Sequence, residues 1–316
     1  MSLVLDQKLL KHLEALHAKY QKVKDGTLPD YIPELAKVNP DLFSISATDV
    51  AGKTMSVGDS EHSFTLQSIS KPFVFAAALE AYGVDAVRDH VGVEPTGEPF
   101  HSLIRLDDKS KRPFNPLVNT GAIAMTDLIL GQGLSERLST MKKIFGEYVG
   151  RRDMEFDEAI MSSEKETGHR NRAIAYLMLH FGMISPRVDE TLDLYFHQCS
   201  LKVTSVDLSV MAATLANNGV NPLTQQRVLS EKYVKYVLTL MMTCGLYTYA
   251  GEWAFEIGLP AKSGVCGGLL IVVPGKMGIG IYSPPLDSHG NSVRGVLAAK
   301  ELSSTYNLHI FGSNLV

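Results

Sequence analysis

The chain has 316 residues, of which 45% are hydrophobic, 20% charged and 8% aromatic, an ordinary composition for a soluble globular protein of one or two domains. The formal net charge is −4 and the basic residues form no long run, which argues against binding to nucleic acid or to anionic membranes. The three cysteines, Cys199, Cys244 and Cys266, are odd in number and far apart, which argues against a disulfide framework and a paired-thiolate zinc site. A small-molecule or protein partner is favoured.

The N-terminal segment carries charges throughout and has leucines at helical spacing, among them Leu9, Leu13 and Leu16. This pattern predicts a helix and not a signal peptide, whose apolar core is uninterrupted. No stretch approaches the roughly 18 apolar residues that a membrane-spanning helix needs. We therefore expect a cytoplasmic protein with no membrane partner.

The next segments predict short strands and then a long helical region. Residues 43–47 alternate apolar and polar side chains ahead of "DVAGKTMSVGD", which predicts a hairpin, and "HSFTLQ" predicts a third short strand. From Ser68 to about residue 240 the pattern is helical. One of these helices, "TSVDLSVMAATLANNG", begins with a capping box from Thr204 to Asp207.

Strand patterns return near the C-terminus, where "GGLLIVVPG" and "KMGIGIYSPP" flank a Pro274-Gly275 turn, and a final helix is predicted from about Ser292 to Tyr306. We therefore predict an α/β fold of the α+β type, in which an antiparallel sheet is flanked by the N- and C-terminal helices and a mostly helical region is inserted between its strands. The sheet-containing region would comprise residues 1–66 and 241–316 and the helical region residues 67–240. The active-site cleft would lie between them.

The stretch "LQSISKPFVF", residues 66–75, places two serines and a lysine at the start of a predicted helix. If Ser68 is the N-cap, Pro72 falls in the first turn, and Ser68 and Lys71 lie on one helix face. The helix dipole would then favour an alkoxide on Ser68, and the apolar run would desolvate Lys71 as a proton acceptor. A helix cap followed by a solvated lysine explains the same residues, so both interpretations stay open. Ser70 receives no chemical role.

A second element, Lys262-Ser263-Gly264, precedes the apolar strand "LLIVVP". A Ser-x-x-Lys motif occurs together with a late Lys-Thr-Gly strand in serine hydrolases, and serine in place of threonine keeps the hydroxyl. Nearby glycines permit close backbone approach, so the N–H groups of Val265 and Ser68 could hold the oxyanion of a tetrahedral intermediate. A plain strand-entry turn or a β-bulge is the alternative interpretation.

Several blocks between about residues 30 and 295 together resemble the serine-dependent glutaminase family. They are "DYIPELA", "LQSISKPF", "NPLVNTGAI", "SEKETGHRNRAIAY", "YFHQCS", "VMAATLANNG", "CGLY", "GLPAKSGVCGG" and "SPPLDSHGNSVRG". The resemblance implies a β-lactamase/transpeptidase-like fold, an amidohydrolase that converts L-glutamine to L-glutamate and ammonia, and a homodimer or homotetramer. No H-E-x-x-H motif, P-loop, complete dinucleotide fingerprint or G-x-S-x-G elbow occurs, so we expect no metal and no cofactor.

The resemblance also implies roles for individual residues. Ser68 would be the nucleophile, Lys71 its proton acceptor and Tyr247 a further proton-transfer group, with Lys262 in a supporting role. The positions implied to bind substrate are Tyr31, Ser68, Asn119, Glu164, Asn171, Tyr195, Tyr247 and Val265. A glutamine zwitterion needs an anion for its ammonium group and neutral donors for its carboxylate, which a glutamate and two asparagines supply. Each of these residue types also occurs in ordinary loops and cores.

Two other functions are compatible with parts of this pattern. A penicillin-recognising serine hydrolase or peptidase shares the Ser-x-x-Lys and Lys-Ser/Thr-Gly elements, but no Ser-Asp-Asn element occurs between them and no export signal is seen. A catalytically silent ligand-binding module on the same scaffold is the second alternative. The sequence leaves open whether Tyr247 or the Ser68–Lys71 pair protonates the departing ammonia.

Overall fold

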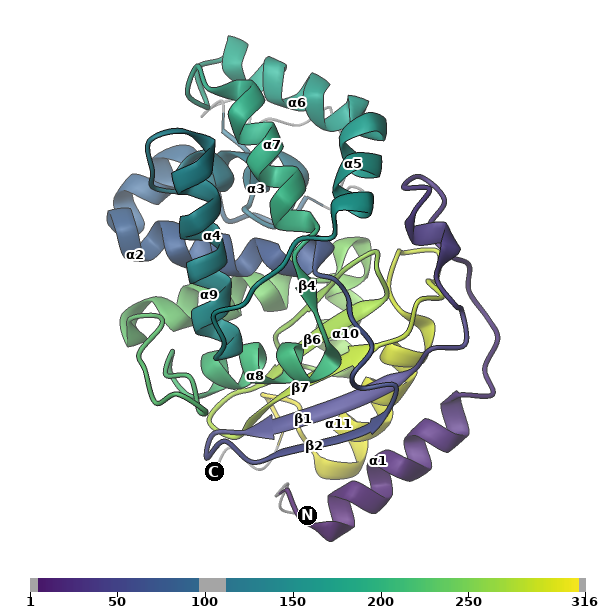
Figure 1. The fold of residues 1–316 in the computed structure, drawn as a ribbon. Coiled ribbons are helices and arrows are strands. Elements are labelled where there is room, and N and C mark those ends of the chain that lie inside the picture. Colours follow the sequence, from purple (N-terminus) through teal and green to yellow (C-terminus); the bar gives the residue numbers. More distant parts are fainter. Residues whose placement is uncertain (1–4, 97–111, 313–316) are drawn as a thin grey trace.

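The computed structural model describes residues 5–96 and 112–312 and contains a five-stranded antiparallel sheet with helices on both faces (Figure 1). Its strand order is β2-β1-β7-β6-β5, with β1 (Ser44–Asp49), β2 (Thr54–Gly58), β5 (Ala261–Ser263), β6 (Gly268–Val273) and β7 (Met277–Tyr282). Both predicted hairpins are present, and β1 pairs with β7, so strands from the two ends of the chain meet at the centre of the sheet. The predicted antiparallel sheet is confirmed.

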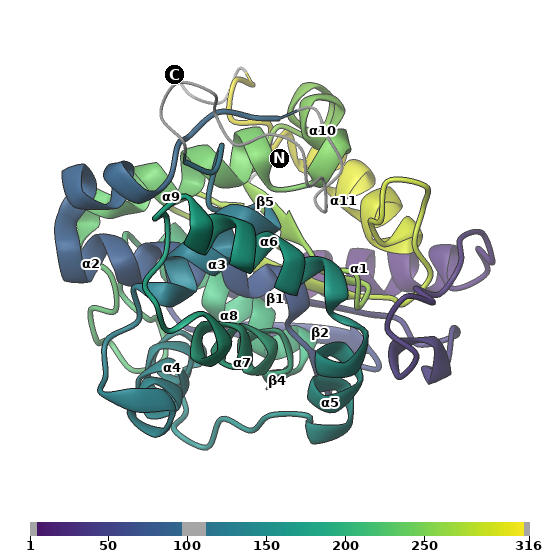
Figure 2. The ribbon, with the colours of Figure 1, turned by 90° about the horizontal axis from the view of Figure 1, so that it is seen from above.

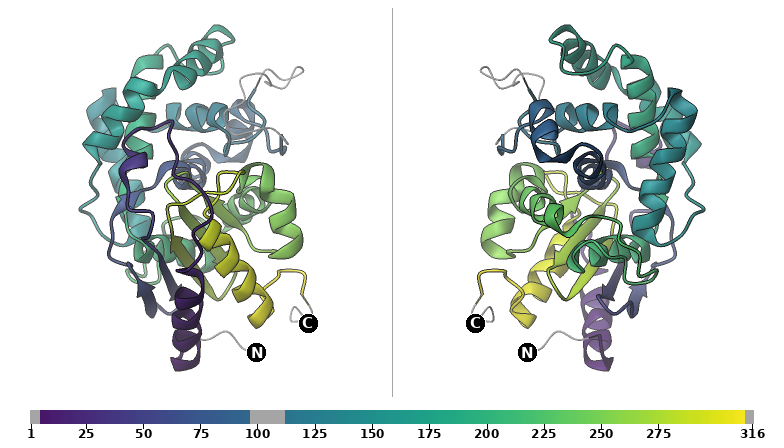
Figure 3. Two further views of the ribbon diagram at one scale, coloured as in Figure 1. Left: turned by 90° about the vertical axis from the view of Figure 1, so that its right-hand side faces the viewer. Right: turned by 90° about the vertical axis from the view of Figure 1, so that its left-hand side faces the viewer.

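One face of the sheet is covered by α1 (Gln7–Tyr20), α11 (Val293–Tyr306) and the short α10 (Ala250–Glu256). The apolar stripe of α1 is buried, as its leucine spacing predicts. The α1 and α11 helices lie side by side (Figure 3). The α11 helix begins where the sequence predicts, because the Ser292 side chain accepts a hydrogen bond from the backbone N–H of Gly295.

On the opposite face, α8 (Ser205–Ala216) lies directly on β7. Two glycines of the strand, Gly278 and Gly280, make this possible, since a Cβ atom on either would lie 2.2 Å from backbone atoms of the helix. The predicted capping box is present, with reciprocal hydrogen bonds between Thr204 and Asp207. The Gly278-Ile279-Gly280 pattern is therefore a packing feature.

The remaining helices form a layer beyond α8 (Figures 1 and 2). They are α2 (Lys71–His90), α3 (Asn119–Asp127), α4 (Gly133–Val149), α5 (Glu158–Thr167), α6 (His169–His180), α7 (Val188–Cys199) and α9 (Glu231–Cys244). Three short 3₁₀ turns are η1 (Leu35–Lys37), η2 (Gln67–Ser70) and η3 (Tyr247–Tyr249). The predicted third strand is the two-residue β3 (Phe64–Thr65), which pairs with β4 (Lys202–Val203) outside the main sheet.

Alternate residues of β6 belong to two hydrophobic clusters. Leu269, Ile271 and Val273 face α1 and α11, whereas Leu270 and Val272 join the cluster formed by the helical layer. The α8 helix lies within residues 67–240 but packs on the sheet, so the division of the chain into two regions stays a prediction. Within the described residues, no helix combines the length and the apolar run needed to cross a bilayer.

Candidate active site

A cleft of about 630 Å³ brings together segments that are distant in the sequence. Its walls are residues 27–32, the N-terminus of α3, parts of α5 and α6, the start of η3, and the loop of residues 286–290. Six of the predicted site residues line it: Tyr31, Asn119, Glu164, Asn171, Tyr247 and Val265. The size and the convergent polar groups are typical of a small-molecule site.

The predicted role of Ser68 as a helix N-cap is wrong. Ser68 lies inside η2, no side chain caps the following helix, and α2 begins only at Lys71. The cause is Gln67, whose φ of 49° turns the backbone sharply and starts a tight 3₁₀ turn instead of a capped α-helix. The Lys71 N–H donates to the Ser68 carbonyl, so the two residues are still one turn apart.

Lys71 is 1% exposed, and among the described residues its ammonium group donates to two neutral acceptors. Nζ donates to Oδ1 of Asn119 at 2.6 Å and to the Leu117 carbonyl at 3.4 Å. Burial lowers the pKa of Lys71 to about 8, because the charged form is poorly solvated there. A lysine with this pKa is partly neutral near physiological pH and can accept a proton.

Lys262 is a second buried lysine, beneath the ring of Tyr247. Its Nζ lies 4.2 Å from the ring centroid and donates to the carbonyls of Gly245 and Ser263 at 2.8 and 2.7 Å. Burial, and after it the charge of Lys71, hold the pKa of Lys262 well below its usual range. The two ammonium groups are therefore close enough to interact.

Tyr247 connects this lysine with the predicted nucleophile. Its hydroxyl donates to the Ser263 carbonyl at 3.3 Å and also hydrogen-bonds with the Ser68 side chain. Burial raises the pKa of Tyr247, and the hydrogen bond with Ser68 only partly opposes this. The residue has a φ of 54°, an uncommon left-handed conformation for a tyrosine. Tyr247 is therefore a protonated phenol held at Ser68.

Glu164 supplies a carboxylate from α5. Burial raises the pKa of Glu164 to about 7, opposed in part by hydrogen bonds from Gln67 and Cys199 and by the charge of Lys71. The Gln67 amide donates to Oε2 at 3.5 Å. No ion pair with Glu164 is present among the described residues, so its charge is available to a cationic ligand.

Asn119 and Asn171 form a hydrogen-bonded pair in the lining of the cleft. Nδ2 of Asn119 donates to Oδ1 of Asn171 at 2.9 Å. Because an ammonium group only donates, Asn119 must direct Oδ1 to Lys71, and its Nδ2 therefore points away from the lysine, toward Asn171. This orientation provides neutral N–H donors without a second positive charge.

The other predicted residues occupy different positions. Tyr31 is 49% exposed, and Val265 packs in a small apolar cluster with Ile32 and Leu286. Ser68, Lys71 and Lys262 are buried and are not among the residues that line the cleft, whereas Tyr247, which contacts Ser68 and Lys262, does line it. Tyr195 is likewise buried and outside the lining. It lies behind Glu164, because its hydroxyl hydrogen-bonds with the Cys199 thiol, which in turn contacts the carboxylate.

Sequence reasoning missed Gln67 and Cys199. Gln67 contacts Glu164 through its side chain and sets the turn before Ser68 through its backbone, and no sequence pattern indicates a left-handed glutamine. Cys199 follows Tyr195 by four residues on α7, and this spacing, which places both side chains on one helix face, could have indicated the contact. In the described part of the chain, no three His, Cys, Asp or Glu side chains gather closely enough to hold a metal ion.

Comparison with known proteins agrees with this geometry. A profile of the glutaminase family matches residues 26–311. A glutaminase from a Nostoc species is 56% identical over 303 residues, covering 96% of this chain and 90% of that protein, and one from Microcystis aeruginosa is 53% identical over 300 residues, covering 95% and 88%.

Solved structures agree as well. A probable glutaminase, ybaS, superposes with a TM-score of 0.93 at 40% identity, over 97% of this chain and 99% of that one. A probable glutaminase from Bacillus subtilis, complexed with 6-diazo-5-oxo-L-norleucine, gives a TM-score of 0.89 at 33% identity over 98% of both chains. The chain belongs to the glutaminase family and has its β-lactamase-like fold.

Proposed function

We propose that the protein hydrolyses L-glutamine to L-glutamate and ammonia through an acyl-enzyme on Ser68. The observation that carries this proposal is the arrangement at η2, where Ser68 lies one turn from a buried lysine with a pKa of about 8 and hydrogen-bonds with Tyr247. Family membership supports glutamine as the substrate, and a related structure is described in its glutamate form.

In the first half-reaction, Lys71 takes the hydroxyl proton while Oγ of Ser68 attacks the amide carbon of the substrate. The backbone N–H groups of Ser68 and Val265 would hold the resulting oxyanion. The C–N bond then breaks, and the nitrogen leaves as ammonia after it receives a proton from Tyr247 or from Lys71. Water attacks the ester in the second half-reaction, releases glutamate and returns the proton to Ser68.

Substrate recognition follows from the charges in the cleft. We assign the substrate ammonium group to Glu164, the buried carboxylate that lines the cleft, and the substrate carboxylate to the amides of Asn119 and Asn171. Tyr31 and Val265 would contact the aliphatic part of the substrate. Tyr195 would act from behind, through Cys199, by holding the carboxylate of Glu164.

The direct test is ammonia release from L-glutamine by purified protein and by the Ser68→Ala variant. We expect the variant to lose turnover while it folds normally, because alanine occupies less space than serine at this buried position. In the wild type, 6-diazo-5-oxo-L-norleucine, whose C5 ketone corresponds to the amide carbonyl of glutamine, should add covalently to Ser68, as peptide mass spectrometry can show. Unchanged ammonia release by Ser68→Ala would overturn the mechanism.

The alternatives give different results in the same assays. A penicillin-recognising hydrolase would open a β-lactam ring and leave glutamine intact. A silent binding module would bind glutamine in calorimetry without releasing ammonia. Loss of turnover with retained glutamine binding in Ser68→Ala and Lys71→Met, together with weakened binding in Glu164→Gln, would support glutamine hydrolysis in this cleft.

We also propose that the active-site cleft lies between the sheet-containing region and the helical region. This is supported by its lining, since Asn119 and Glu164 come from residues 67–240, and Tyr31 and Val265 from the remainder. The family resemblance further suggests a homodimer or homotetramer in the cytoplasm. Light scattering after gel filtration and cell fractionation would test these two points, and a monomer at micromolar concentration would contradict the first.

A further inference from the structure

The backbone immediately before Ser68 is held in an unusual conformation. Gln67 has a φ of 49°, in the left-handed region that non-glycine residues rarely occupy. Such a conformation is strained and persists only where surrounding contacts hold it. The neighbours of Gln67 must therefore supply that support.

A chain of three hydrogen bonds reaches the Gln67 carbonyl from the helical layer. The Ser70 hydroxyl donates to it at 2.7 Å, and Ser70 Oγ accepts from Nε2 of Gln198 at 2.9 Å. Oε1 of Gln198 accepts in turn from the Thr126 hydroxyl at 2.7 Å. All four residues are buried, with Ser70, Gln198 and Thr126 at 0% exposure. Each polar atom in the chain thus has a partner.

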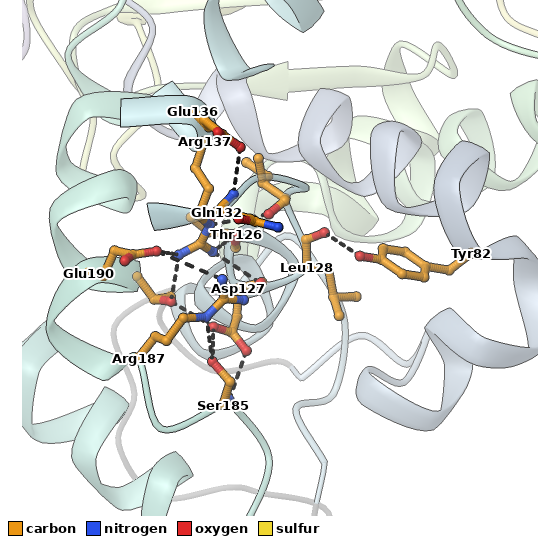
Figure 4. Close-up of polar contacts among 12 residues, drawn as sticks. Tyr82, Thr126, Asp127, Leu128, Gln132, Glu136, Arg137, Ser185, Arg187 and Glu190 are labelled. Atoms are coloured by element: carbon orange, nitrogen blue, oxygen red, sulfur yellow. Dashed lines mark hydrogen bonds and ion pairs between the residues drawn. The ribbon is translucent and has the colours of Figure 1, made fainter. Parts of the chain in front are cut away.

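The far end of this chain is anchored to three helices. The Thr126 carbonyl accepts from Nη2 of Arg137 at 2.9 Å, and Arg137 also donates to the carbonyls of Asp127 and Ile129 (Figure 4). Thr126 lies near the end of α3, Arg137 on α4 and Gln198 on α7. The support under Gln67 therefore does not depend on one flexible side chain.

The Gln67 carbonyl and the Ser68 N–H belong to the same peptide group. Because a peptide is planar, a bond that fixes the carbonyl oxygen also fixes the direction of the N–H on the other side. A hydrogen bond to the oxygen polarises the peptide and strengthens its N–H as a donor. The Ser68 N–H is one of the two groups assigned above to the oxyanion.

We propose that Ser70 and Gln198 are positioning residues that aim and polarise the Ser68 N–H for the oxyanion. This inference rests on the proposed glutamine hydrolysis. Ser70 would then affect catalysis through the Gln67 carbonyl, without contacting the substrate. Since the oxyanion exists only in the transition state and intermediate, losing this support lowers kcat and leaves KM nearly unchanged.

The test compares Ser70→Ala and Gln198→Leu with wild type in glutamine turnover. We expect kcat to fall about 10- to 100-fold in Ser70→Ala, and less in Gln198→Leu, with KM within about twofold. The double variant should be no slower than Ser70→Ala, because Gln198 acts through Ser70. Ser70→Thr, which keeps the hydroxyl, should recover most of the lost kcat.

The matched control is Ser46→Ala. Ser46 is equally buried and its hydroxyl hydrogen-bonds to Ser205 at 2.9 Å, on the sheet under α8. This variant should lose stability comparable to Ser70→Ala and keep wild-type kcat. A kcat of Ser70→Ala within twofold of wild type, equal kcat losses in both variants, or additive losses in the double variant would overturn the inference.

Two further outcomes are separable. Normal turnover by Ser68→Ala would refute the proposed mechanism, whereas an inactive Ser68→Ala with a normal Ser70→Ala would refute the positioning role alone. If Ser70→Ala does not fold, Gln198→Leu carries the test, since a fall in its kcat with constant KM supports the role and a wild-type kcat contradicts it.

Discussion

Two regions of the molecule bury charge in opposite ways. Around Arg137, the guanidinium group forms an ion pair with Glu190 at 2.7 Å and donates to three backbone carbonyls (Figure 4). At the cleft, Lys71 and Lys262 are equally buried, yet no carboxylate contacts either ammonium group among the described residues. Their partners are amide and carbonyl oxygens and, for Lys262, the ring of Tyr247. The first arrangement neutralises charge, and the second only solvates it.

The difference explains which region carries chemistry. An ion pair would stabilise the charged lysine and keep its pKa high, whereas neutral dipoles leave burial as the dominant cause and lower the pKa toward the working range. The pKa values of about 8 for Lys71 and about 7 for Glu164 follow from this environment. We expect the buried charged groups of the cleft to lower the free energy of unfolding while they make the site reactive. We expect the residues around Arg137 to stabilise the fold and to have no effect on reactivity.

The largest expected effect is that of Lys71→Met. Loss of the proton acceptor should reduce turnover by about 1000-fold or more, while removal of a buried charge should raise the free energy of unfolding by about 1 to 3 kcal/mol at pH 7. The direction of this change follows from the lowered pKa of Lys71 in the folded state. Burying the charged lysine destabilises the wild type fully below pH 8, and this destabilisation disappears as the pH rises toward 10.5. Urea denaturation measures it. The control is Lys300→Met, which breaks an exposed ion pair with Glu256 and should change the free energy of unfolding little. A Lys71→Met variant less stable than wild type would contradict the expected difference between the cleft and the Arg137 region.

Asp127→Ala should have the opposite effects to Lys71→Met, with lower stability and nearly unchanged turnover. Asp127 accepts hydrogen bonds from the Ser185 N–H and hydroxyl and from the Thr191 hydroxyl, all between 2.6 and 2.8 Å. Leaving these donors without an acceptor should lower the free energy of unfolding by about 3 kcal/mol. Turnover per folded molecule should change little. A large fall in kcat at wild-type stability would show that the two regions are not distinct.

Glu164→Gln and Glu190→Gln make the same change in both regions. At the cleft we expect KM for glutamine to rise about 10- to 100-fold, because the ammonium group loses its charged partner. The same variant should be more stable than wild type above pH 7, since the raised pKa of Glu164 shows that ionisation opposes folding there. Glu190→Gln should instead weaken the ion pair with Arg137 and lower stability. Stability changes of the same sign would contradict the comparison.

The smallest effect is the pH dependence of kcat/KM. The proposed mechanism requires a neutral Lys71 and an ionised Glu164, so kcat/KM should rise with pH and level off above about 8. The slope should be about one decade per pH unit between 7 and 8 and steeper below 7. In Glu164→Gln the steeper part should disappear. A profile flat from pH 6 to 9 would refute these assignments.

Much of the fold could be predicted because its signals are local. The alternation in the hairpins, the capping box at Thr204 and the last helix from Ser292 all depend on neighbouring residues. The prediction of an N-cap at Ser68 was wrong because the conformation there depends on distant residues. The φ of Gln67 is imposed by hydrogen bonds that reach it from Gln198 and Thr126, far along the chain, and no local pattern records them.

In the candidate site, too, part of the description follows from the sequence and part depends on tertiary contacts. Residue types indicated the chemistry, and family motifs indicated the positions, but the lowered pKa of Lys71 depends on Asn119 being its partner in place of a carboxylate. The contact of Lys262 with the Tyr247 ring also depends on tertiary structure. Partner identity decides the electrostatics, and it is a property of the assembled cleft.

The pairing of β1 with β7 has a consequence for how the protein is made. Ser44 pairs with Tyr282, so β1 cannot pair with β7 until more than 230 further residues have left the ribosome. Contacts so distant in sequence form slowly, and until then one edge of the first hairpin stays open to pairing with other chains. The same delay applies to the cleft, whose walls include Tyr31 and Val265. A nascent chain can therefore not be active before Val265 and the strand that ends at Tyr282 have been synthesised.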